Sequence, residues 1–150
     1  MYLDLFLAIL HHVLVFAVAA AIAAEFVLVR PGLAGRELRL LAQVDQLYGA
    51  AATAVIVVGV LRVLYGLKGW EFYVYSTSFW AKIAAFAAVA VLSVFPTVRI
   101  LGWRRGMRRS TGLYVVPDAE LAAVRRFIRW ELGVFMLIPV FAAMMARGIY

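Results

Sequence analysis

Four apolar runs of about 20 residues dominate this chain. A helix of roughly that length crosses a hydrocarbon core of about 30 Å, so each run is typical of a membrane-spanning helix. The pattern predicts helices over residues 2–29, 44–67, 79–101 and 118–147. A transmembrane barrel needs strands in which apolar and polar residues alternate, and these runs lack that alternation. The sequence therefore predicts an all-α fold: one domain, residues 1–150, that forms an integral membrane four-helix transmembrane bundle.

The composition excludes a water-soluble domain. Apolar residues make up 67% of the chain and charged residues 15%, whereas soluble domains are roughly 45–50% apolar and about 25% charged. So little charge cannot cover a soluble core of this size. The chain also has no cysteine, which excludes thiolate metal sites, iron–sulfur clusters and cysteine nucleophiles.

Positive charge is distributed unevenly between the two ends of the predicted bundle. Cations are few at the end that holds both termini, and the loops after the first and third helices, with their flanks, hold eleven arginines: Arg30, Arg36, Arg39, Arg99, Arg104, Arg105, Arg108, Arg109, Arg125, Arg126 and Arg129. The positive-inside rule places such loops in the cytoplasm. We therefore expect a multi-pass protein of the bacterial inner membrane with both termini outside, in the periplasm. We expect the arginines to contact anionic lipid headgroups at the cytoplasmic face, and no nucleic acid, despite a net charge of +7.

Ionisable residues inside the spans are candidates for function because charge is expensive to bury in lipid. Asp4, His11, Val18 and Glu25 follow one another at intervals of seven. Each step of seven drifts only about 20° round a helix, so these residues form one stripe that is predicted to face the bundle interior. His12 lies about 100° from His11 and points elsewhere. Which of the two histidines faces the interior stays open.

Depth along the helices predicts two polar layers. The inner layer holds three acids and an arginine. Together with Asp4 they make up a predicted polar network: Asp4, Glu25, Asp45, Arg99 and Glu131. We expect Glu25, Asp45 and Glu131 to form ion pairs with Arg30, Arg99 and Arg129, with a proton relay as the alternative. The outer layer holds cations and histidines: His11, His12, Arg62 and Lys82.

The outer layer has the groups that a haem requires. Haem iron takes an axial ligand such as histidine, with a second histidine or methionine in some proteins. We predict His11 as the ligand of the haem iron, His12 as its substitute, and Arg62 and Lys82 as partners of the propionates. Met136 is a candidate second ligand, as are Met144 and Met145. A zinc or copper site is disfavoured because adjacent histidines diverge on a helix and no third ligand accompanies them.

Several segments together resemble a bacterial family of four-helix membrane proteins known as a domain of unknown function. The resemblance covers nearly the whole chain and rests on Leu10-His11-His12, Glu25-Phe26-Val27-Leu28-Val29-Arg30-Pro31-Gly32, Asp45-Gln46-Leu47-Tyr48-Gly49, Lys68-Gly69, Phe79-Trp80-Ala81-Lys82, Pro96-Thr97, Glu131-Leu132, Ile138-Pro139 and Met145-Ala146-Arg147-Gly148. The resemblance implies a four-helix membrane fold and does not indicate any particular activity.

The chain is more distantly similar to HemJ-type protoporphyrinogen oxidases and CopD-like membrane proteins. The similarity lies in Leu10-His11, in Trp80 to Lys82, and in Arg126 to Glu131. HemJ-type proteins bind haem b, so this resemblance implies haem b as the cofactor.

Two functions remain open at this point. The first is binding of b-type haem or a related porphyrin between the helices, for electron transfer or tetrapyrrole oxidation. The alternative is a membrane module without a cofactor or an enzymatic activity: a small carrier, a channel subunit or an assembly partner. Pairs of alanines spaced four apart, such as Ala17 and Ala21 or Ala20 and Ala24, allow close helix approach, from which we expect a homo-oligomer, with a dimer as the first choice.

Overall fold

The computed structural model describes residues 2–66 and 69–147. Its elements, in chain order, are α1 (Tyr2–Leu28), α2 (Gly35–Tyr65), α3 (Gly69–Val74), α4 (Thr77–Arg109), α5 (Asp118–Phe135) and α6 (Leu137–Ala146). In this part of the chain the only β feature is an isolated bridge between Ala34 and Val115. Four helical stretches, α5 and α6 counting as one, are long and apolar enough to cross a membrane. The predicted all-α class is therefore confirmed.

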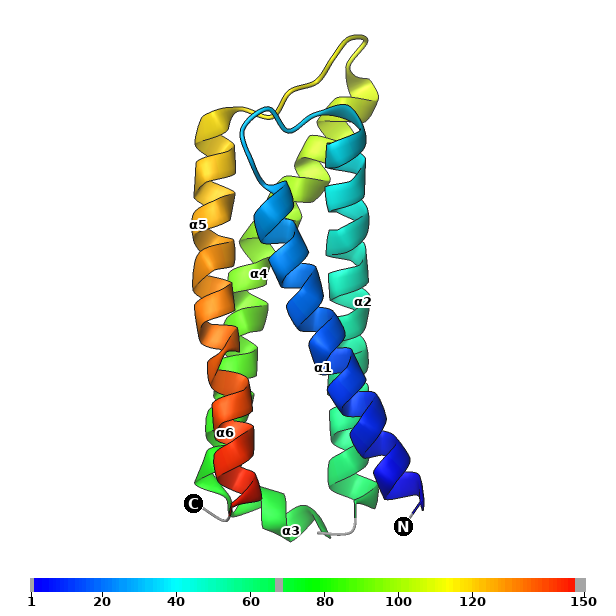
Figure 1. The fold of residues 1–150 in the computed structure, drawn as a ribbon, viewed down its shortest axis with the longest axis vertical. Coiled ribbons are helices and arrows are strands. Elements are labelled where there is room, and N and C mark those ends of the chain that lie inside the picture. The colour runs from blue at the N-terminus through cyan, green and yellow to red at the C-terminus, as the bar shows by residue number, and fades with distance from the viewer. Residues whose placement is uncertain (1, 67–68, 148–150) are drawn as a thin grey trace.

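The helices form an elongated bundle with two distinct ends (Figure 1). Both ends of the chain and α3 lie at one end, which we call the terminal end. The loops 29–34 and 110–117 lie at the other, which we call the arginine end. The Leu33 carbonyl accepts a 3.1 Å hydrogen bond from the Val116 amide, which ties these two loops together.

Two helices extend beyond the predicted spans at the arginine end. α2 begins at Gly35 rather than at 44, and α4 continues to Arg109 rather than ending at 101. The added turns of α2 are rich in arginine and leucine and those of α4 are rich in arginine, and both are good helix formers, so each helix continues beyond its apolar run. The predicted end of the second span at 67, and Lys68, lie outside the described residues.

The fourth span is two helices rather than the single predicted one. α5 ends at Phe135 and α6 begins at Leu137, with Met136 between them. Pro139 lies four residues after Phe135, so it has no amide to bond the Phe135 carbonyl and its ring crowds that group. Pro139 therefore explains the break.

Packing is tight at the arginine end and loose at the terminal end. α1 packs mainly on α2, while α4 packs on α5 and α6, which divides the bundle into two halves. The largest fully buried apolar side chains lie toward the arginine end: Ile22, Leu33, Leu38, Leu41, Ile100 and Ile128. Towards the terminal end the two halves diverge (Figure 1).

Candidate functional site

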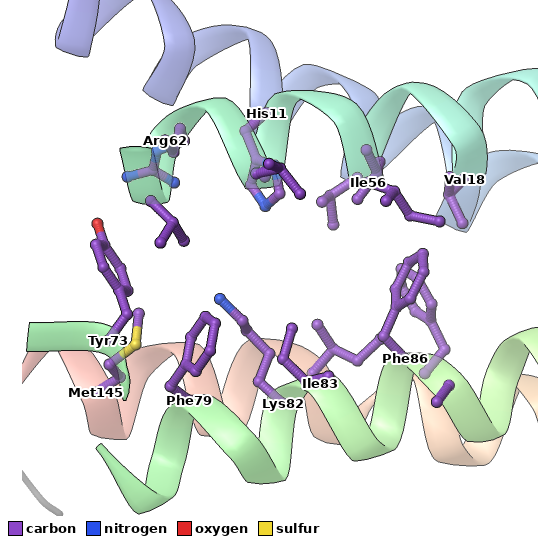
Figure 2. A pocket seen from close by; sticks show the side chains of 18 of the residues that line it. His11, Val18, Ile56, Arg62, Tyr73, Phe79, Lys82, Ile83, Phe86 and Met145 are labelled. Atoms are coloured by element: carbon purple, nitrogen blue, oxygen red, sulfur yellow. The ribbon is translucent and has the colours of Figure 1, made fainter. Parts of the chain in front are cut away.

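A cavity of about 480 Å³ lies between the two halves of the bundle, on the terminal side of Val18. One wall comes from α1 and α2, and the other from α4, α5 and α6, with Tyr73 of α3 at the terminal end (Figure 2). The lining is mostly aliphatic and aromatic. A volume of this size is within the range of about 300–1,000 Å³ that small-molecule sites occupy. We call it the cationic cavity, for the groups described next.

Three basic side chains line this cavity. His11 of α1 and Arg62 of α2 lie on one wall, and Lys82 of α4 extends toward them from the opposite wall (Figure 2). The Lys82 Nζ lies 5.1 Å from the centre of the Phe79 ring. The Nδ1 of His11 is buried and has no hydrogen-bond partner among the described residues. The cavity thus combines an apolar interior with an available imidazole nitrogen and two cations.

Gly59 of α2 makes room for the His11 ring. A Cβ built at Gly59 would lie 3.5 Å from the His11 Cε1 and 3.9 Å from its Nδ1. That is ordinary van der Waals contact for one methyl group, and a larger side chain would meet the imidazole. Gly59 therefore helps to set the position of the ring, a role the sequence analysis did not assign to it.

Two of the other candidate ligands, His12 and Met136, lie outside the cavity. His12 is exposed, and its Nδ1 lies 2.7 Å from the Ala8 carbonyl oxygen in its own helix. Met136 is 64% exposed at the break between α5 and α6 and does not line the cavity. Met145 of α6 does line it. The structure thus brings together His11, Arg62 and Lys82, and leaves His12 and Met136 apart from them.

The predicted stripe on the first helix faces the bundle interior. Val18 and Glu25 are buried, and His11 lines the cationic cavity. Asp4 lies at the terminal end of α1, close enough to Gly66 that a Cβ there would be 3.3 Å from its Oδ1. Asp4 is therefore far from the acids of the inner layer.

Three acidic side chains are buried in the half of the bundle nearer the arginine end. Glu25 of α1 is 1% exposed, Asp45 of α2 is 4% exposed and Glu131 of α5 is fully buried. The Tyr48 hydroxyl donates a 2.6 Å hydrogen bond to Oε1 of Glu131. The Thr97 hydroxyl donates a 2.7 Å hydrogen bond to Oδ1 of Asp45. We call Glu25, Asp45 and Glu131 the carboxyl cluster.

The ion pairs that we expected for these acids are absent from the described residues. Arg30 instead pairs with Glu37 at 2.6 Å. Arg99 lies 3.8 Å from Glu120, and Arg129 is exposed. The prediction of arginine partners was wrong because the long arginine side chains reach the surface, where an exposed acid or water is available at lower cost than the interior.

A second cavity, of about 370 Å³, lies between α2 and α4 beside the carboxyl cluster. Its polar lining comes from Asp45, Tyr48, Thr53, Ser93 and Thr97. Three of its lining residues, Val18, Ile56 and Phe86, also line the cationic cavity. The two cavities therefore adjoin at these three side chains.

Tyr48 and Thr97 were not singled out by the sequence analysis, although each leaves a signal in the sequence. Tyr48 follows Asp45 by one helical turn, and Thr97 is a hydroxyl-bearing residue in an apolar run. Within the described ranges, no three histidine or acidic side chains are placed to hold a metal ion.

Comparison with known protein families identifies the family of this chain. The family described as "Predicted membrane protein (DUF2214)" matches residues 3–150, and the chain belongs to it. No curated protein and no solved structure matches the chain.

Proposed function

Starting from membership of the DUF2214 family of predicted membrane proteins, we propose that this protein binds b-type haem or a closely related porphyrin in the cationic cavity. His11 would be the axial ligand of the iron, and Arg62 and Lys82 would bind the two propionates. The observation that carries the proposal is the unpartnered His11 Nδ1 in an apolar cavity that two cations also line.

The residues present suit this group chemically. A haem needs an imidazole or a comparable ligand for its iron, apolar surroundings for its ring, and cations for its carboxylates. Phe79, Ile83 and Phe86 supply apolar surface opposite His11 (Figure 2). Met145 replaces Met136 as the methionine nearest to the site, because it lines the cavity. The resemblance to HemJ-type proteins at Leu10-His11 and Trp80 to Lys82 supports the same ligand.

The chemistry follows from the group and its surroundings. A bound haem would supply one-electron redox chemistry, suited to electron transfer or to tetrapyrrole oxidation. The protein's contribution would be to fix the ring between the two halves of the bundle, to orient the imidazole and to exclude bulk water with apolar walls.

The arginines set the orientation that we propose for the protein. With the arginine end in the cytoplasm of a bacterium, both termini and the cationic cavity would lie in the outer half of the inner membrane. Small residues on α1 would allow a homodimer to form.

The test is the visible absorption spectrum of the protein purified in mild detergent, oxidised and then reduced with dithionite. We expect a Soret band with sharp reduced bands in the wild type, lost in His11→Ala. His12→Ala is the matched control and should keep the bands, since His12 lies outside the cavity. A wild-type protein that stays colourless after haemin is added would overturn the proposal and favour a carrier or assembly partner without a cofactor.

A further inference from the structure

The carboxyl cluster has two oxygen atoms whose hydrogen-bonding capacity is unused. Oε1 of Glu25 and Oε2 of Glu131 are buried and have no hydrogen-bond partner among the described residues. Both side chains are at most 1% exposed. A buried carboxylate without a partner is strongly disfavoured, whereas a protonated carboxyl group carries no net charge. Such atoms are typical of a site that holds a proton.

Four helices contribute the three acids of the cluster and the two hydroxyl groups that donate to them, and none of these groups is a cation. α1 contributes Glu25, α2 contributes Asp45 and Tyr48, α4 contributes Thr97, and α5 contributes Glu131. Protons are therefore the positive charge best placed to neutralise the three acids.

Two arginines on the helices that carry these groups, Arg125 and Arg99, have other partners. Arg125 donates a 2.9 Å hydrogen bond to the Val29 carbonyl and lies 4.3 Å from the centre of the Phe26 ring. Arg99 lies over the Phe95 ring and near Glu120. Neither makes a hydrogen bond or an ion pair with an acid of the cluster in the described structure.

An apolar layer closes the cluster toward the arginine end. Leu41, Ile100 and Ile128 lie about one helical turn from Asp45, Thr97 and Glu131 in that direction, and all three are fully buried. A layer packed this closely leaves no room for water. This layer therefore separates the cluster from the arginine end.

In the opposite direction the structure has open space. The second cavity, which Asp45 and Tyr48 line, has room for several waters at about 30 Å³ each and offers them hydroxyl and carboxyl partners. It adjoins the cationic cavity at Val18, Ile56 and Phe86. The 14 residues from His11 to Glu25 correspond to about 21 Å of helix, which is the distance a proton route would cover.

We propose that Glu25, Asp45 and Glu131 form a proton-binding site that exchanges protons only with the terminal end, through the second cavity and past Phe86 into the cationic cavity. Asp45 is the acid of the cluster that lines the second cavity, so a proton held by Glu25 or Glu131 would pass to Asp45 and leave the Asp45 carboxyl group for a water in the cavity, or return by the same steps. No oxidant or reductant takes part. The proposal does not depend on haem, because none of these residues is a ligand in the function proposed above.

The first experiment is infrared spectroscopy of the full-length protein in lipid at neutral pH, in H₂O and after transfer to D₂O. We expect a C=O stretching band of protonated carboxyl groups that shifts in D₂O, and that loses intensity in Glu25→Gln and in Glu131→Gln. Glu71→Gln is the control, since Glu71 is exposed on α3. Absence of the band, or a band that the two cluster variants leave unchanged, would overturn the proposal. A band that never shifts in D₂O would also overturn it, because the protons would then be fixed.

The second experiment tests the route. Phe86→Ala should accelerate the D₂O shift of this band several-fold by opening the junction between the cavities. Phe95→Ala is a matched control on the same helix: Phe95 stacks on Phe127 at 4.4 Å between ring centres and lines neither cavity. Equal exchange rates in the two variants would contradict a route past Phe86. Size-exclusion profiles and circular dichroism of all variants show whether each has folded.

Discussion

The cationic cavity and the carboxyl cluster lie on the same helices but differ in the surroundings of their ionisable side chains. In the cavity the two halves of the bundle diverge, and His11, Arg62 and Lys82 border open space. In the cluster the halves close, and two of the three acids accept hydrogen bonds, from Tyr48 and Thr97. We therefore propose that ionisable residues in these helices mark a ligand site where the helices separate and a proton site where the helices pack.

The largest expected effect is on stability, and it compares the packing of the two regions. Ile100→Ala should lower the free energy of unfolding by about 2–5 kcal/mol, because Ile100 is fully buried and its removal leaves a void. Ile83→Ala should lower it by less than about 1 kcal/mol, because Ile83 already lines a cavity. Thermal unfolding in detergent measures both. Equal losses would mean that the two ends of the bundle are packed alike.

A second prediction concerns the hydrogen bond inside the carboxyl cluster. Tyr48→Phe removes the donor to Glu131 and leaves Oε1 of that residue without a partner, so we expect a loss of about 1–3 kcal/mol in stability. Thr53→Val is the control, because the Thr53 hydroxyl donates only to the Gly49 carbonyl in its own helix and is exposed. Its effect should stay within about 0.5 kcal/mol. If both variants unfold at the same temperature, the buried hydrogen bond does not stabilise the cluster.

The sequence predicted the spans and the depth of most polar groups, because both depend on distances along a single helix. Intervals of seven placed His11 and Glu25 on the interior face, and rise per residue placed Arg62 and Lys82 in one layer. The break at Met136 was also within reach, since Pro139 cannot bond the Phe135 carbonyl.

The partners of the acids could not be predicted in the same way. Tyr48 and Glu131 are 83 residues apart, and Thr97 and Asp45 are 52 apart. Such contacts depend on the rotation and register of neighbouring helices, which one sequence does not fix. The choice of arginine partners failed for the same reason: charge complementarity alone ignores that Arg99 reaches Glu120 near the surface.

A third prediction tests the position of the imidazole. Gly59→Val adds a Cβ that would lie 3.5 Å from the His11 Cε1 and two methyl groups beyond it, so the ring must move. We expect about tenfold weaker haemin binding in an absorbance titration, which corresponds to about 1.4 kcal/mol. Gly133→Val on α5 is the control: a Cβ there meets nothing within 4 Å, and the change in helix propensity is the same. Unchanged haemin binding in Gly59→Val would remove His11 from the site.

The smallest predicted effect has the opposite sign. Lys82 and Arg62 line an apolar cavity, so replacing Lys82 by methionine removes a cation while keeping an unbranched side chain of similar length. Without a ligand, Lys82→Met should raise stability by about 0.5–1 kcal/mol, and the same variant should bind haemin more weakly, as expected where a binding site has a cost in stability. Arg30→Met is the comparison at the arginine end. It breaks the exposed 2.6 Å pair with Glu37 and should lower stability by at most about 1 kcal/mol. Thermal unfolding with and without haemin measures both variants. A Lys82→Met protein that is less stable and binds haemin as well as the wild type would show that Lys82 serves packing rather than the ligand. The cationic cavity would then not differ from the carboxyl cluster as a ligand site.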